Sequence, residues 1–182
     1  EGKIRQFWAR NPDSEFRPIL LKRLYPYLDI SKGRGLTYVK KFFGEALDQH
    51  QSAFFAHFPR WSTTSKVTEF FSEDLKQQLR NDAVKTIESS MPTAISGWHS
   101  FNKAQYVEAK SLMGGYLLCS QGDRMLLGNS VEGRFPFLDH RVIEFANSVH
   151  PKYKMKVLNE KNLLKKAFAK YLPAKMTKRC KQ

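Results

Sequence analysis

The sequence is poor in several features that define whole classes of protein. Its 182 residues contain two cysteines, Cys119 and Cys180, which are too few for a disulfide framework. No apolar run approaches the ~18–20 residues that a membrane span needs. The first residues, from Glu1 to Arg10, also lack the apolar segment of a signal peptide. The sequence therefore predicts a soluble, cytoplasmic protein with no membrane partner.

Motifs that hold metals or phosphates are also missing. The H-E-x-x-H, C-x-x-C and G-x-x-x-x-G-K patterns do not occur, and Gly114-Gly115 lies within an apolar helical pattern. The histidines fall at no metal-ligand spacing; they are His50, His57, His99, His140 and His150. We therefore predict no metal site and no cofactor bound by this chain alone.

Acidic residues are scarce relative to basic ones. Thirty-one Lys and Arg against 17 Asp and Glu give a net charge of +14, which favours anionic partners. The basic residues spread over the whole chain, without the interleaved aromatics of a single-strand binder or a helix-turn-helix pattern. Nucleic acid is thus not the expected partner. Attraction for a polyphosphate ligand explains part of the excess, particularly near the C-terminal end, and a basic helical module that binds RNA or an acidic protein stays an alternative.

Helical periodicity is what the sequence has in abundance. Apolar residues recur at helical spacing over 36–47, 103–120, 142–149 and 163–171, whereas no strand-like alternation of convincing length occurs. Residues 1–182 are enough for one domain of ordinary size with a core. The pattern predicts an all-α fold, with Ser72, Asp139 and Asn159 as N-caps of three helices.

The segment from Gln121 to Arg141 concentrates charges around a short apolar run. Phe135-Pro136-Phe137-Leu138 cannot continue a helix, because Pro136 lacks a backbone donor and restricts the residue before it. Four consecutive bulky apolar residues predict burial, with the nearby charges paired at the edge of a core. Arg134 is expected to pair with Asp139 or Glu132. Such a corner either fixes the entry and exit of two helices or shapes a ligand cleft, and both interpretations stay open.

The same segment carries a family resemblance. Asp123-Arg124-Met125, followed by S-x-E-x-R-x-P-F-L-D at 130–139, closely resembles the signature of the ATP-dependent synthetase domain of the asparagine synthetase family. Further matches are E-K-x-L-L-K at 160–165 and the closing R-x-K-Q at 179–182. The resemblance implies that this chain is the helical part of a larger α/β synthetase domain, packed against a nucleotide-binding half.

The resemblance also implies a reaction. Enzymes of this family use ATP and magnesium to activate the aspartate carboxylate as an adenylate, which ammonia from glutamine converts to asparagine. Relatives with the same signature act on other carboxylates and close β-lactams or cyclise peptides. The family's S-G-G-x-D-S loop, its acidic magnesium loop and its glutaminase cysteine are absent from this sequence. We therefore expect a piece truncated at both ends, inactive alone, whose partners are small-molecule substrates, an N-terminal glutaminase domain and an ATP-binding half.

Site residues follow from the resemblance position by position. Lys181 matches the lysine of the closing motif and is expected to be catalytic, reaching the ATP phosphates and the reacting acyl group; a solvated lysine in a basic tail is the alternative. Asp123, Arg124 and Glu132 are candidates for the substrate or ATP cleft, whereas Arg134 and Asp139 are expected to be structural. The apolar surface that meets the α/β half is expected to be exposed in this piece, which favours self-association as a homo-oligomer.

Overall fold

The computed structural model describes residues 1–24, 33–79 and 83–179. The described residues form helices and no strand, apart from an isolated bridge between Lys156 and Asn159, which confirms the all-α prediction. Their contacts divide the chain into two compact units, Glu1–Ser111 and Leu112–Gln182. No helix in this described part is both long enough and apolar enough to cross a bilayer.

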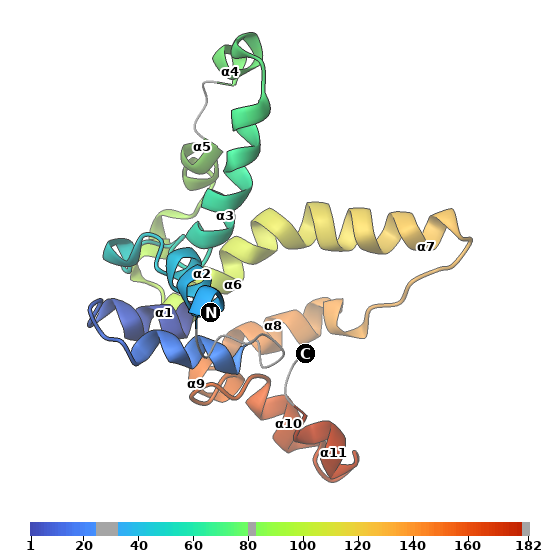
Figure 1. The fold of residues 1–182 in the computed structure, drawn as a ribbon. Coiled ribbons are helices and arrows are strands. Elements are labelled where there is room, and N and C mark those ends of the chain that lie inside the picture. The colour runs from blue at the N-terminus through green and yellow to red at the C-terminus, as the bar shows by residue number, and fades with distance from the viewer. Residues whose placement is uncertain (25–32, 80–82, 180–182) are drawn as a thin grey trace. The chain divides into compact units, whose positions relative to one another are not determined.

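The first unit begins with three helical elements (Figure 1). Helix α1 covers Gly2–Ala9 and ends before Pro12, and a 3-10 helix follows at Arg17–Arg23, with Pro18 in its first turn. Helix α2 spans Gly33–Phe43. Proline at the start of a helix loses no hydrogen bond, because its missing N–H has no intrahelical partner there.

Further short helices continue this unit. Ser72 has extended backbone geometry, and its hydroxyl accepts a hydrogen bond from the Leu75 N–H at 3.2 Å, which confirms it as the N-cap of α4. The elements are the 3-10 helix Leu47–Gln49, α3 at Phe58–Ser65, the 3-10 helix Lys66–Phe70, α4 at Glu73–Gln78, α5 at Ala83–Ser89, the 3-10 helix Thr93–Gly97 and α6 at Ser100–Glu108.

The hydrophobic core of the described chain lies in this first unit. Helix α1 packs against the first 3-10 helix and against α6, and apolar side chains from all three are buried. Burying one such side chain stabilises the fold by about 1.5–3 kcal/mol. The buried apolar residues are Ile4, Trp8, Leu21, Val39, Phe43, Phe54, Phe55 and Val107.

A charged residue, Arg5, is completely buried among these apolar side chains. Its guanidinium donates to the carbonyl oxygen of Phe43, with Nε at 2.9 Å, and also to the carbonyls of Phe55 and Glu45. Burial lowers the pKa of Arg5 to about 10, so the side chain stays charged at neutral pH. Arg5 thereby connects α1 to Phe43 at the end of α2 and to Phe55, shortly before α3 begins at Phe58.

One helical path runs from α6 through a π-helical segment, Ala109–Asp123, into α7 at Arg124–Gly128 (Figure 1). This path contains the helix predicted over 103–120, but its winding widens after Glu108. At that point the Ser111 hydroxyl donates to the Val107 carbonyl at 2.7 Å. A hydroxyl that bonds back to the carbonyl four residues earlier competes with the backbone and is associated with distorted helices.

The described part of the second unit contains the end of the π-helical segment, α7, a short 3-10 helix and four further α-helices, and α10 packs against α9 and α11. The prediction that Asn159 caps the last long helix is wrong: α10 begins at Asn162, and Lys161 occupies the cap with φ 54°. Asn159 instead accepts a hydrogen bond from Lys165 Nζ at 3.2 Å. The elements are the 3-10 helix Pro136–Leu138, α8 at His140–Ser148, α9 at Pro151–Lys154, α10 at Asn162–Phe168 and α11 at Ala174–Thr177.

Burial differs sharply between the two units. Among the described residues from 112 to 179, Pro151 and Asn162 are the only buried ones, and neither is a large apolar residue. Large apolar side chains of this unit instead face solvent, including Leu127 and Phe137, which are 70% and 68% exposed. The second unit therefore has no hydrophobic core within its described part.

Candidate functional site

The signature segment lies in the second unit, and its charged residues occupy successive short elements. Asp123 ends the π-helical segment, Arg124 begins α7, and both are exposed. Glu132 and Arg134 follow in the irregular stretch before the 3-10 helix, and Asp139 follows that helix. Lys181, the predicted catalytic residue, lies outside the described residues.

Arg134 pairs with Glu132, one of its two predicted partners. Arg134 Nη2 lies 2.7 Å from Glu132 Oε1, but the two side chains are 80% and 70% exposed. The prediction of a buried pair is therefore wrong, because the adjacent apolar run does not cover it. An ion pair in water contributes about 0–1 kcal/mol, since solvent screens the charges and ordering the side chains costs entropy.

Asp139 has a different partner. Its carboxylate accepts a hydrogen bond from the Arg141 backbone N–H at 2.9 Å, which confirms it as the N-cap of α8. It also accepts two bonds from the Arg141 guanidinium, at 3.1 and 3.0 Å. These side-chain bonds lower the pKa of Asp139 and raise that of Arg141. The alternative pairing of Asp139 with Arg134 is not formed.

The apolar run beside these charges is exposed, contrary to the sequence prediction. Phe135 is 43% and Phe137 68% exposed. A shallow hollow of about 540 Å³ lies nearby, and its walls are Pro136, Asp139, Arg141, Val142 and Phe145. Asp123, Arg124 and Glu132 do not line this hollow. The structure thus keeps the cleft candidates apart from it, and their role in binding stays a prediction.

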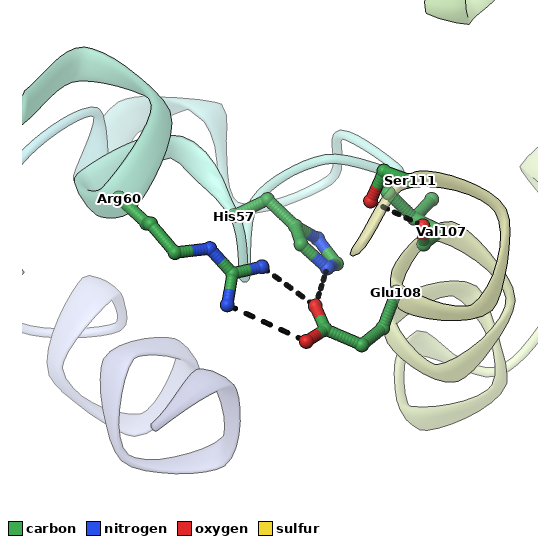
Figure 2. Close-up of polar contacts among 5 residues, drawn as sticks. All are labelled: His57, Arg60, Val107, Glu108 and Ser111. Atoms are coloured by element: carbon green, nitrogen blue, oxygen red, sulfur yellow. Dashed lines mark hydrogen bonds and ion pairs between the residues drawn. The ribbon is translucent and has the colours of Figure 1, made fainter. Parts of the chain in front are cut away.

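A second polar cluster, which the sequence did not reveal, lies in the first unit (Figure 2). The Glu108 carboxylate, at the end of α6, points toward His57 and Arg60 at the start of α3. His57 Nε2 lies 2.9 Å from Glu108 Oε2, and Arg60 donates to the two carboxylate oxygens at 2.6 and 3.4 Å. We call these three residues the His57–Glu108–Arg60 cluster. Partners separated by about 50 positions leave no pattern in a single sequence.

Burial sets the protonation states in this cluster. His57 is 3% exposed, and burial lowers its pKa although the hydrogen bond to Glu108 opposes the shift. For Glu108, burial acts to raise the pKa, but the hydrogen bond and positive charge of Arg60 outweigh it, so the pKa is lowered. At neutral pH a neutral His57 therefore donates from Nε2 to a Glu108 carboxylate. The cluster therefore joins the end of α6 to the start of α3.

Comparison with known proteins places the chain in a family. The sequence model of the family described as asparagine synthase matches residues 12–182. The chain belongs to the asparagine synthase family.

Individual asparagine synthase relatives match shorter stretches. The chain is 40% identical over 81 residues to the amidase chyE of Penicillium rubens, a match that covers 41% of this chain and 12% of that amidase. It is 38% identical over 76 residues to the amidase chry2 of Gibberella zeae, covering 38% and 11%. It is 32% identical over 118 residues to the glutamine-hydrolyzing asparagine synthetase 1 of Bacillus subtilis, covering 62% and 18%. The matches thus span less than a fifth of each relative, and no solved structure matches the chain significantly.

The asparagine synthase family implies ATP and magnesium, and the residues described here do not fit that pair. No group of three His, Cys, Asp or Glu side chains within 1–24, 33–79 and 83–179 is arranged to hold a metal ion. The sequence also contains no glycine-rich phosphate loop. We therefore assign no ATP or magnesium ligand to these residues.

Proposed function

We propose that this chain is a helical part of an ATP-dependent amide-forming enzyme that converts aspartate to asparagine with ammonia from glutamine. The observation that carries the proposal is the family match over residues 12–182, which includes the complete signature at 123–139. ATP and magnesium are proposed to bind to an α/β half, and glutamine to a glutaminase domain, both outside this sequence. The matches cover only 12% and 18% of the lengths of two relatives, which supports the proposal that the other parts of the enzyme lie outside this sequence.

A second candidate keeps the chemistry and changes the carboxylate. The two fungal relatives, at 40% and 38% identity, carry the name amidase rather than asparagine synthetase. The residues that determine substrate specificity are proposed to lie outside this chain. Its helices are therefore compatible with aspartate or with another carboxylate as the substrate.

The test is a reaction of the full-length protein with ATP, magnesium and glutamine, with aspartate as the carboxylate. Release of pyrophosphate together with asparagine is the expected result. Pyrophosphate release that depends on another carboxylate would favour the second candidate. A protein that releases no pyrophosphate with any carboxylate, and carries no S-G-G-x-D-S loop, would contradict both.

Lys181 is the residue proposed to act in this reaction. Departure of pyrophosphate builds negative charge, and a mobile ammonium group stabilises such charge without a fixed bidentate geometry. We expect Lys181→Ala in the full-length enzyme to lower turnover by roughly 10² or more, as the loss of one electrostatic donor does in other enzymes. Pyrophosphate release at saturating ATP and aspartate measures it, with an unchanged melting temperature as the control. Turnover within a few-fold of wild type would make Lys181 a surface charge.

A further inference from the structure

A long segment of the first unit contributes no buried residue to its core. Between Pro59 and Val107, none of the residues that the structure describes is buried. This segment leaves the core through α3, continues into α4 and returns through α5 (Figure 1). We call residues 60–99 the arm, because at the start of α6 the Ser100 hydroxyl already bonds to the side-chain oxygen of Gln6 in α1, at 3.1 Å. The arm therefore depends on the contacts at its two ends.

The His57–Glu108–Arg60 cluster joins these two ends (Figure 2). His57 and Arg60 lie at the start of α3, where the chain leaves the core, and Glu108 lies at the end of α6, after the chain has returned. The bonded partners are 51 and 48 positions apart. The hydrogen bonds of a single carboxylate thus close the base of the arm.

His57 is satisfied at only one of its two ring nitrogens. Nε2 is bonded to Glu108, whereas Nδ1 is buried and has no hydrogen-bond partner among the described residues. In a neutral imidazole that donates from Nε2, Nδ1 is an acceptor, and uptake of a proton turns it into an N–H donor. A buried donor without an acceptor costs free energy, which contact with water would recover. The closed base therefore accommodates the neutral ring better than the charged one.

The charged groups that face His57 act in opposite directions. Glu108 on α6 and Glu1, which precedes α1, attract a protonated imidazole, whereas Arg60 on α3 repels it. The Trp61 ring, whose centroid lies 5.3 Å from that of His57, also favours a cation. Burial outweighs these attractions and keeps the pKa of His57 below its usual value. An opened base would expose the ring to water, so the opened form binds the proton more readily.

We propose that the cluster is a pH-sensitive closure, in which neutral His57 holds the base of the arm together and protonated His57 opens it while the core around α1 stays folded. Opening transfers the charges of Glu108 and Arg60 to water and exposes no buried residue of the described arm, because it has none. Local openings that lose few apolar contacts require less free energy than global unfolding. The proposal does not depend on the proposed reaction, since it concerns contacts within the first unit alone.

Amide hydrogen exchange of the purified chain at pH 7.5 and 5.5, corrected for the intrinsic exchange rate at each pH, tests the proposal. The amides of residues 57–61 report on the base of the arm. The His57 and Phe58 N–H groups donate to the Phe54 carbonyl, and the Trp61 N–H donates to the His57 carbonyl. The amides of α1 are the internal reference for global unfolding.

Three variants separate the contributions to this exchange. His57→Gln keeps an N–H donor toward Glu108 but does not titrate. Glu108→Gln keeps an acceptor for His57 but removes the charge that holds Arg60. The matched control is His50→Gln, because His50 is exposed. Circular dichroism verifies that each variant keeps its helical content.

In wild type and His50→Gln, we expect the exchange of residues 57–61 to rise severalfold at pH 5.5 relative to α1. The ceiling is about tenfold, because a solvated histidine with a pKa near 6.5 is protonated in roughly tenfold excess at that pH. His57→Gln should show no such rise. Glu108→Gln should exchange at least roughly tenfold faster than wild type already at pH 7.5, since it loses hydrogen bonds between charged groups.

Four results would each overturn the proposal: no rise in wild type, an equal rise in His57→Gln, an equal rise in the amides of α1, or a Glu108→Gln variant indistinguishable from wild type at pH 7.5. If circular dichroism shows that His57→Gln does not fold, the wild-type and Glu108→Gln measurements decide between these outcomes.

Discussion

The Arg134–Glu132 ion pair lies almost wholly in solvent, which changes what Arg134 is expected to contribute. From sequence, a buried partner would make Arg134→Ala cost about 3–5 kcal/mol. With side chains that are 80% and 70% exposed, the structure instead predicts a loss below about 1 kcal/mol. Urea unfolding of Arg134→Ala, beside Arg124→Ala as an exposed control, measures the difference. A loss of several kcal/mol would show that Arg134 is buried in solution.

His57 gives the first unit a pH dependence whose sign is fixed by burial. Its pKa in the folded state is lowered from 6.5, so between that lowered value and 6.5 the unfolded chain binds more protons than the folded chain. The free energy of unfolding should therefore fall as the pH drops below about 6.5. The lowered pKa of Glu108 acts in the same direction, but only as the pH falls below about 4.5.

We expect His57→Gln, which keeps an N–H donor toward Glu108, to flatten this pH dependence between pH 7.5 and 5.5. Urea unfolding at the two pH values measures it, since the variant has no imidazole to protonate at that position. His50→Gln is the matched control, because His50 is exposed. If His57→Gln and wild type lose equal stability on acidification, a group other than His57 takes up the proton.

At the scale of elements, helix α8 depends on its first turn. Asp139 accepts the Arg141 backbone N–H and pairs with the Arg141 side chain. Asp139→Ala removes both contacts and should lower the melting temperature by roughly 2–6 °C, whereas Asp139→Asn keeps the cap and should lower it less. Thermal scans of the two variants separate capping from charge. Equal losses in both would mean that the ion pair, rather than the cap, stabilises α8.

Local sequence signals predicted where helices begin better than they predicted which side chains are buried. The caps Ser72 and Asp139 form as expected, because a short polar side chain just before an apolar helical pattern can accept a hydrogen bond from a backbone N–H of the first turn. Asn159 fails as a cap, because its side chain takes part in contacts with Lys165 and Asn162 instead. The run at 135–138 was predicted to be buried from its composition, but burial requires a partner surface, which a local pattern does not contain. The His57–Glu108–Arg60 cluster depends on a long-range contact and was invisible for the same reason.

At the scale of the whole molecule, exposed apolar side chains predict association. Phe135, Phe137, Phe145 and Val142 are each 40% or more exposed, and exposed apolar groups of this kind mark interaction surfaces. We expect the isolated chain to self-associate at micromolar concentration, since this surface is proposed to meet the α/β half in the complete enzyme. Sedimentation velocity over a concentration series measures it. Phe137→Ser/Phe145→Ser should shift the equilibrium toward monomer, and Phe70→Ser, in the first unit and 87% exposed, is the control.

Chains that stay monomeric at every concentration, and a wild type indistinguishable from Phe137→Ser/Phe145→Ser, would contradict this expectation. Dissociation by Phe70→Ser to the same extent would instead move the interface to the first unit.

The contrast in burial between the two units also bears on how their amide protons exchange with solvent. Protection of an amide reflects the free energy of the opening that exposes it, and that free energy is small where few apolar contacts are lost. In the isolated chain, amides of α1 and α6 should therefore exchange slowly, behind the core that includes Ile4 and Val107, whereas those of α8 and α10 should exchange fast. Docking of the second unit against a partner surface would slow exchange of the α8 and α10 amides alone. Deuterium uptake measured separately for the two units would therefore show whether the second unit is bound to a partner.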